Sequence, residues 1–145
     1  MRWALLSDIH SNLEALEAVL RDLEKRAVDR ICFLGDLVGY GASPNECAAL
    51  ARSSGFTAIL GNHDRAVLSG RKLQLFNHYA RRAVEWTQTA LSGGHRDYLA
   101  TWPVTMTLPP AVLVHGALTG SDHYILSGAD IPSNLDLLKA QHPEA

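Results

Sequence analysis

The sequence lacks the features of several classes of protein. Its 145 residues include only two cysteines, Cys32 and Cys47, which do not form a Cys-x-x-Cys pair. Two buried thiols in a reducing compartment are therefore expected, rather than a disulfide scaffold. No apolar run approaches the roughly 18 residues of a membrane span, and the amino-terminal segment has neither the length nor the cleavage site of a signal peptide. These absences predict a cytoplasmic protein without a membrane partner.

An excess of charge of one sign is also absent. The formal net charge is −2, and no basic run or patch stands out, so the sequence carries no nucleic-acid-binding signature. No Gly-x-Gly-x-x-Gly follows the first apolar run, which argues against a nucleotide-binding dehydrogenase. The composition, 47% hydrophobic and 19% charged, is that of an ordinary globular protein. The length predicts a single domain over residues 1–145.

Four short apolar runs are typical of buried strands, at residues 2–7, 31–34, 56–60 and 111–114. Each run ends in side chains that can bind a metal or move a proton. These side chains belong to Asp8, His10, Asp36, Asn62, His63, Asp64 and His115. Ligands bind outside the carboxyl ends of strands in α/β sheets. If the four strands lie side by side, all seven residues meet at one site.

The segments between these runs predict the fold class. Apolar residues at helical spacing begin at Leu13 and predict a first helix, and Ser11 with Glu14 fits a capping box at its start. A second helix is expected from Pro44. The resulting β-α-β-α-β order predicts an α/β domain with a mostly parallel sheet. Further on, we expect a helix at 77–91, a hairpin at 105–115 and a last helix at 133–140 that starts with a Ser133–Asp136 capping box.

Carboxylate, imidazole and amide oxygen groups together form a mixed ligand set that suits divalent Mn, Fe, Zn, Co or Ni. Two such ions about 3.5–4 Å apart clamp the attacking and leaving oxygens of a phosphoryl displacement and lower the pKa of a bound water. The leaving oxygen then needs a proton. His63 followed by Asp64 offers an imidazole that a carboxylate could orient.

Each residue also has a structural interpretation when it is taken alone. Asp36 suits a turn, Asn62 a left-handed turn, and His115 a hydrogen-bonded core histidine. Four strand ends that all carry ligand-type residues favour a site instead. The remaining histidines are not at strand ends and are expected to be exposed or hydrogen-bonded; they are His78, His95, His123 and His142.

Four stretches carry the candidate residues: Ser7-Asp8-Ile9-His10-Ser11-Asn12, Gly35-Asp36-Leu37-Val38-Gly39-Tyr40-Gly41, Gly61-Asn62-His63-Asp64 and Val114-His115-Gly116. In this order they resemble successive motifs of the calcineurin-like metallophosphoesterases, and most closely the small bacterial and archaeal phosphodiesterase branch. The resemblance covers nearly the whole chain. It implies an α/β fold in which a β-sandwich is flanked by helices, in the layer order α/β/β/α.

The resemblance also implies a dinuclear metal centre. Asp8 and His10 would bind the first ion, and Asp36 would bridge both ions. Asn62 and His115 would bind the second ion. The implied cofactors are two divalent ions, with manganese favoured and iron, zinc, nickel or cobalt as alternatives.

The implied reaction is hydrolysis of a phosphate monoester or diester, with a small phosphoester or a nucleotide as substrate. A metal-bound hydroxide would attack without a covalent enzyme intermediate. His63 would be a catalytic residue, as general acid or as hydrogen-bond donor to the phosphoryl group. Asp64, behind it, would be the second catalytic residue.

One family motif is not found. A Gly-His-x-His normally follows the His115 motif by some tens of residues and adds one histidine to each metal. This sequence contains none, so the fold is expected to be incomplete at its carboxyl end. Three explanations compete: a fragment, which we favour, a site completed by a partner chain, or a degenerate site. An open sheet edge would promote self-association, so a homo-oligomer is a further expectation.

Two functions of different classes follow. The first is a metal-dependent phosphoesterase, which the five ligand residues and His63 favour. The second is a non-catalytic protein-binding scaffold on the same fold, which the absent motif favours. The two differ in whether the chain turns over a phosphoester with a divalent ion.

Overall fold

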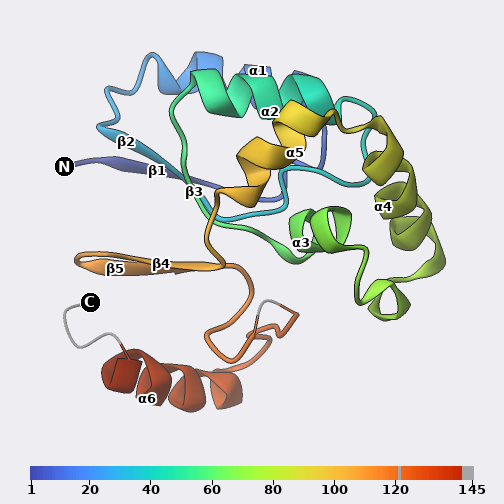
Figure 1. The fold of residues 1–145 in the computed structure, drawn as a ribbon. Coiled ribbons are helices and arrows are strands. Elements are labelled where there is room, and N and C mark those ends of the chain that lie inside the picture. Colours follow the sequence, from blue (N-terminus) through green and yellow to red (C-terminus); the bar gives the residue numbers. More distant parts are fainter. Residues whose placement is uncertain (121, 142–145) are drawn as a thin grey trace.

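Two β-sheets lie face to face between layers of helices (Figure 1). The structure is a computed structural model that describes residues 1–120 and 122–141. The strands β1 (Trp3–Leu6), β2 (Arg30–Phe33) and β3 (Thr57–Ala58) form a parallel sheet in the order β1-β2-β3. The strands β4 (Thr105–Leu108) and β5 (Ala111–Val114) form an antiparallel hairpin. The parallel sheet and the separate hairpin were both expected from the sequence.

The two sheets share a small apolar core. Cys32 of β2 and Ile59, just after β3, pack with Leu113 of β5, and all three side chains are buried. Met106 and Leu108 of β4 border this cluster. Cys32 and Cys47 are both free and buried, as the sequence predicted. Because side chains alternate across a strand, the other face of the parallel sheet is left for helices to cover.

A larger core lies on that other face, beneath α1 (Leu13–Leu23), α2 (Pro44–Ser53) and α5 (Gly93–Ala100) (Figure 1). Phe33 of β2 and Leu99 of α5 are fully buried in it. The helix α6 (Ile131–Gln141) lies beyond the hairpin, on the opposite side of the molecule (Figure 1). The layer order is therefore α/β/β/α, which confirms the predicted fold class.

Three connecting elements follow β3. They are α3 (Asn62–Ser69), the short 3-10 helix η1 (Leu73–Leu75) and α4 (His78–Ala90). The side chains of Tyr79 and Trp86 in α4 are 80% and 46% exposed. The face of α4 that packs inward carries Ala80, Val84 and Thr87 instead.

Both predicted capping boxes are wrong. The cap of α1 is Asn12, whose side-chain oxygen accepts a hydrogen bond from Ala15 N at 3.0 Å. Ser11 has a φ of 57° and is turned toward the loop after β2. The second box belongs to Ser127 and Asp130 in the 3-10 helix η2 (Gly128–Asp130), so α6 begins at 131 and not at 133.

The third strand is shorter than predicted. The apolar run covers 56–60, but only Thr57 and Ala58 pair with β2. Leu60 N donates instead to Pro103 O, at 2.8 Å, because the chain leaves the sheet there to enter α3. In the described part of the chain, no helix is long and apolar enough to cross a membrane.

Candidate metal centre

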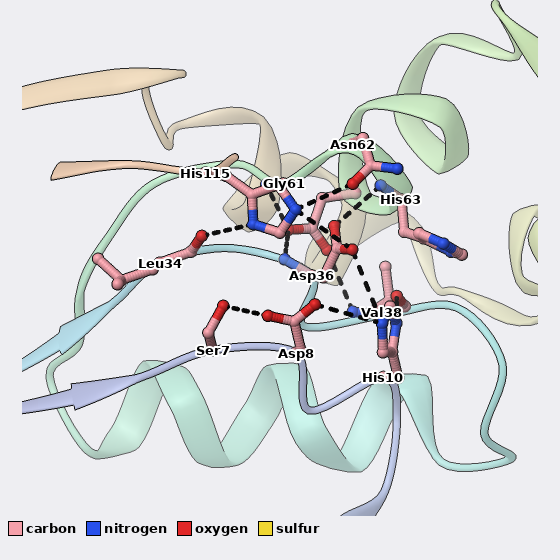
Figure 2. A network of polar contacts seen from close by, with 11 residues as sticks. Ser7, Asp8, His10, Leu34, Asp36, Val38, Gly61, Asn62, His63 and His115 are labelled. Carbon is pink, nitrogen blue, oxygen red and sulfur yellow. Dashed lines mark hydrogen bonds and ion pairs between the residues drawn. The ribbon is translucent and has the colours of Figure 1, made fainter. Parts of the chain in front are cut away.

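The strand ends deliver the predicted side chains to one place. Asp8 and His10 follow β1, and Asp36 follows β2. Asn62 opens α3 directly after β3. The fourth strand, β5, belongs to the hairpin rather than to the parallel sheet, so the four strands do not lie in one row. His115 nevertheless reaches the same edge from the second sheet (Figure 2).

The carboxylate of Asp36 occupies the middle of this group. Its Oδ1 accepts a hydrogen bond from the backbone N–H of His63 at 2.9 Å, in the first turn of α3. Its Oδ2 lies 3.7 Å from His10 Nε2 and 3.5 Å from His115 Nε2. Only 2% of Asp36 is exposed. One carboxylate oxygen is thus placed between two imidazole nitrogens that come from different sheets.

Both imidazoles are held in the same way. His115 Nδ1 lies 2.8 Å from the carbonyl oxygen of Leu34, and His10 Nδ1 lies 3.3 Å from that of Val38. A carbonyl can only accept a hydrogen bond, so in each neutral ring the proton is on Nδ1 and the lone pair is on Nε2. Both lone pairs point toward Asp36. Fixing the ring through its other nitrogen is the arrangement that prepares a histidine to bind a metal.

Asn62 adds a further acceptor. Its Oδ1 lies 2.9 Å from His115 Nε2 (Figure 2). In the neutral tautomer described above, both atoms carry lone pairs and neither has a proton to share. Two acceptors this close are stabilised by a cation that both can bind. Their spacing also suits such ligation, since two ligands of one ion with bonds of about 2.1 Å are about 3–3.5 Å apart.

Two overlapping groups of ligand atoms result. His10, Asp36 and His63 offer one set of atoms within 4.8 Å of one another, and Asp8, Asp36 and His115 offer another. Asp36 belongs to both sets. Asp8 is the most exposed of these groups, with 54% of its side chain accessible, and it accepts a hydrogen bond from Ser7 Oγ.

Burial and neighbouring charge raise the pKa of Asp36. Desolvation raises its pKa to about 8, the carboxylates of Asp64 and Asp8 add to the rise, and the hydrogen bond from His63 N opposes it. Burial also raises the pKa of Asp64, against the three backbone N–H groups that donate to its carboxylate. A buried pair of carboxylates is destabilising unless protons or cations neutralise it. The centre is therefore poised to exchange a proton for a cation.

His63 and Asp64 do not form the oriented pair that the sequence suggested. The carboxylate of Asp64 accepts from Asp36 N at 2.8 Å, Gly61 N at 3.0 Å and Val38 N at 3.1 Å. Consecutive helical residues project about 100° apart, so the two side chains diverge at the start of α3. Asp64, fully buried, joins the loop after β2 to the start of α3 and does not touch the ring of His63.

The ring of His63 is enclosed by other rings. Its centroid lies 4.7 Å from His10, 4.8 Å from Tyr40 and 4.7 Å from Phe76. In the described part of the chain, its Nδ1 is buried without a hydrogen-bond partner. Burial, aided by His10 and His115, lowers the pKa of His63 to about 4. The ring is therefore neutral near pH 7, with one N–H available to donate.

Backbone strain is concentrated at the centre. Seven non-glycine residues in the described part have a positive φ. Five of them border the site: Asp8, His10, Ser11, Asp36 and Tyr40. Such conformations cost of order 1 kcal/mol each and persist where surrounding contacts enforce them. Here the two loops bond to each other, with His10 N donating to Asp36 O at 3.0 Å and Ser11 N to Leu37 O at 2.8 Å.

Close backbone approach explains one glycine of the motifs. A Cβ on Gly61 would lie 2.0 Å from Asp36 Oδ1 and 2.4 Å from Asp36 N. No larger residue fits unless Asp36 moves. The glycine therefore lets the third strand end come against the second, which sets the position of the central carboxylate.

The histidines expected outside the site lie apart from these two groups. His95 Nδ1 lies 3.1 Å from both Asn45 Oδ1 and Ser92 Oγ. His123 Nδ1 lies 3.0 Å from Thr119 Oγ1, and His78 packs against Tyr79. His142 lies outside the described residues.

The sequence led us to expect that residues 39–41 and 65–77 border the site, but it assigned no contact with His63 to Tyr40 or Phe76. Tyr40 and Phe76 both pack on His63, yet an aromatic residue in a loop carries no local signal of such a contact. The two glycines around Tyr40 were a hint, because they mark a loop that approaches other backbone closely. Phe76 arrives from the segment between α3 and α4.

Comparison with known proteins decides the family. The sequence profile of calcineurin-like phosphoesterases matches residues 1–140. The chain belongs to this family. The resemblance noted in the four motifs is thereby confirmed, and the structure places those motifs around one centre.

Individual relatives agree with this assignment. The chain is 46% identical over 101 residues to the uncharacterized protein MJ0912 of Methanocaldococcus jannaschii, a match over 70% of this chain and 42% of that protein. Among solved structures, a metallophosphoesterase from Sphaerobacter thermophilus is similar with 39% identity and a TM-score of 0.79, over 94% of this chain and 56% of that one. The hypothetical protein PH1004 of Pyrococcus horikoshii OT3 shares the fold alone, at 20% identity and a TM-score of 0.80, over 94% and 65%. The chain thus spans less than half of the curated relative and less than two thirds of either solved structure.

Proposed function

We propose that this chain carries the active centre of a metal-dependent phosphoesterase that hydrolyses phosphate monoesters or diesters with two divalent ions. One observation supports this most directly. Asp36 Oδ2 lies between the Nε2 atoms of His10 and His115, while the Nδ1 atom of each ring is held by a backbone carbonyl. This arrangement suits a carboxylate that bridges two ions.

The side chains present fit such a pair of ions. Asp8 and His10 would hold the first ion and Asn62 and His115 the second, with Asp36 shared. A bound cation would stabilise the two facing acceptors, His115 Nε2 and Asn62 Oδ1. It would also replace the proton that the Asp36 carboxyl retains near pH 7. Divalent ions at such a centre supply Lewis acidity and make hydroxide available near neutral pH. Mixed oxygen and nitrogen ligands suit several divalent metals, and we propose manganese among them because the family resemblance implies it.

His63 would act on the substrate. Its neutral ring can donate an N–H hydrogen bond to a phosphoryl oxygen or to the leaving oxygen, and it would act as general acid only after protonation to the imidazolium. The rings of Tyr40 and Phe76 would fix its orientation in place of a carboxylate. We propose that Asp64 contributes by holding Asp36 and Gly61 in position rather than by contact with the substrate.

The decisive experiment is hydrolysis of bis-(p-nitrophenyl) phosphate by the 145-residue chain, with Mn²⁺ and with a chelator. Turnover that requires Mn²⁺ is expected, with a loss of about 100-fold or more in His63→Ala, within the range for removal of one hydrogen-bond donor to the transition state. His95→Ala is the matched control, because this histidine is also hydrogen-bonded but lies outside the centre. Activity that survives chelation, or that Asp36→Asn leaves unchanged, would refute the proposal.

The second candidate is a protein-binding scaffold with a degenerate metal site. The exposed apolar side chains beyond residue 103, such as Leu126 at 85%, favour it. It predicts Mn²⁺ binding no tighter than micromolar and no turnover of any phosphoester. The single-domain organisation, the cytoplasmic location and the homo-oligomer stay predictions from the sequence.

A further inference from the structure

A cleft with aromatic walls adjoins the proposed centre. It has a volume of about 330 Å³ and is lined by Asn62 and His63 on the side of the metal ligands. Tyr40, Phe76 and Tyr124 also line it. Its volume lies in the range of pockets for small organic ligands, roughly 300–1,000 Å³. A substrate whose phosphate lies at the centre can place its next group in this cleft.

The walls of the cleft are suited to a planar ring. Tyr40 and Tyr124 are 49% and 68% exposed, so part of each ring is accessible to a ligand. Phe76 meets the ring of His63 edge-on, with an interplanar angle of 86°, while Tyr40 is tilted by 37° to that ring. Aromatic side chains at such angles bind another ring by stacking on one wall and by edge contact with the next.

Polar groups border the same cleft. Asn77 and Asp122 line its rim, and Asp122 is paired with Lys72 at 2.5 Å. A carboxylate and an amide beside an aromatic wall can accept and donate hydrogen bonds to the hydroxyl groups of a sugar. The cleft thus combines ring contacts with a polar edge.

We propose that this cleft binds an aromatic group attached to the scissile phosphate, a nucleobase or an aryl ring, and so selects aromatic phosphoesters over aliphatic ones. The inference rests on the proposed phosphoesterase function, which places the phosphate at the metal centre. Tyr124 is the specificity-determining residue that is easiest to test, because it is exposed and lies outside the candidate ligand set.

The first test measures binding without metal. Adenosine, phenol and ribose are titrated into the metal-free chain by ligand-observed NMR. Adenosine should bind and ribose should not, and Tyr124→Ser should weaken adenosine binding about tenfold, in the range for base stacking on an aromatic side chain. Tyr124→Phe should restore it. Tyr79→Ser is the control, because Tyr79 is 80% exposed on α4 and does not line the cleft.

Several outcomes would overturn the proposal. The proposal is overturned if neither adenosine nor phenol binds, or if ribose binds as tightly as adenosine. It is also overturned if Tyr124→Ser and Tyr79→Ser lose the same affinity for adenosine. Binding of adenosine alone would support a nucleoside ester, and binding of phenol as well would support aryl esters in general.

A second titration separates this inference from the proposed function. AMP and ribose 5-phosphate are titrated into the Mn²⁺-loaded chain by calorimetry. Tighter binding of AMP than of ribose 5-phosphate supports the cleft, and equal binding overturns it even if phosphate is bound. If adenosine binds in the Tyr124-dependent way but its phosphate adds no affinity, the cleft stands and the phosphoesterase proposal fails.

Discussion

The two ends of this chain are packed very differently. Of the 21 buried apolar residues in the described part, only Leu113 and Ala117 lie beyond residue 103. Six of the twelve exposed large apolar residues lie there, including Leu126 at 85%. The helix α6 has no buried residue among those described. Residues 1–103 thus hold nearly all of the core, and residues 104–141 hold little of it.

The centre is divided unequally between the same two regions. His115 comes from the second region, and the other candidate ligands come from the first. His115 is tied to the first region by its bond to the Leu34 carbonyl and by Leu113, which is buried between the sheets. This difference predicts that changes in the first region damage stability and site together. Changes in the second region should alter either metal affinity or self-association through the exposed apolar surface, with little effect on the free energy of unfolding.

Among the residues of the candidate centre, the largest effect on folding is expected at Asp64. Asp64→Asn leaves fewer acceptors for three buried backbone N–H groups, and each unsatisfied buried donor costs about 1–3 kcal/mol. We expect the free energy of unfolding, measured in urea without metal, to fall by roughly 3 kcal/mol. Asp97→Asn, at an exposed position of α5, should stay within about 0.5 kcal/mol. Equal losses of unfolding free energy in the two variants would contradict the role of Asp64 in holding the loop after β2 to the start of α3.

Gly61→Ala tests the close approach of the strand ends. The added Cβ would overlap Asp36 Oδ1 and push the central carboxylate away from the two imidazoles. We expect Mn²⁺ affinity, measured calorimetrically, to fall about 100-fold, which corresponds to roughly 2.8 kcal/mol. Gly94→Ala in α5 is the control, since no atom lies within 4 Å of its added Cβ. An unchanged affinity in Gly61→Ala would show that Asp36 does not ligate metal.

His115→Ala separates metal binding from folding. Loss of even an outer-shell group costs about 10–100-fold in metal affinity, so we expect at least a tenfold loss if His115 is the ligand we propose. The metal-free free energy of unfolding should fall by only about 1 kcal/mol, the value of the hydrogen bond to Leu34. His95→Ala should cost similar stability and leave the affinity unchanged. A large loss of stability in His115→Ala would show that the second region supports the fold more than its burial indicates.

The pH dependence of metal binding reports on Asp36. Its raised folded-state pKa, about 8, means that the metal-free folded chain retains a proton that the unfolded chain has released. Between the ordinary pKa of an aspartate and about pH 8, folding must therefore take up a proton at Asp36, so the free energy of unfolding decreases as the pH rises through this range. Metal must displace this proton, so Mn²⁺ affinity should fall up to about tenfold per pH unit below pH 8.

Titrations with Mn²⁺ at pH 6, 7 and 8 check this slope. In Asp8→Asn the midpoint of the pH profile of Mn²⁺ affinity should move to lower pH, because the charge of Asp8 contributes to the raised pKa of Asp36. A flat profile, or a midpoint that Asp8→Asn leaves in place, would contradict this account.

The smallest effect on folding is expected at the exposed apolar surface of the second region. Leu126→Ser should change the free energy of unfolding by less than about 0.5 kcal/mol and reduce self-association, measured by sedimentation velocity. Leu16→Ala, at a fully buried position of the first region, should cost about 2–5 kcal/mol. If the unsubstituted chain and Leu126→Ser both sediment as monomers, the chain does not self-associate through this surface.

Much of the fold was predictable because its signals are local. The four apolar runs located β1, β2, β3 and β5, the predicted hairpin located β4, and the Pro44 start of α2 was also predicted. The errors concern ends of elements. Ser11 and Ser133 look like helix caps, but tertiary contacts place Ser11 in a left-handed loop and begin α6 two residues earlier. The end of β3 likewise depends on Pro103, 43 residues from Leu60 along the chain.

The sequence by itself determined which side chains meet at the centre, because a buried strand followed at once by a ligand residue puts that residue at a sheet edge. Only the tertiary structure decided how they act. The carboxylate of Asp64 accepts hydrogen bonds from the backbone N–H groups of Val38 and Asp36, which lie 26 and 28 residues away along the chain, and not from its neighbour His63. The rings of Tyr40 and Phe76, from two other loops, contact His63 instead. Such choices depend on which buried donors lack an acceptor once the chain has folded. Short-range sequence patterns carry no information about that balance.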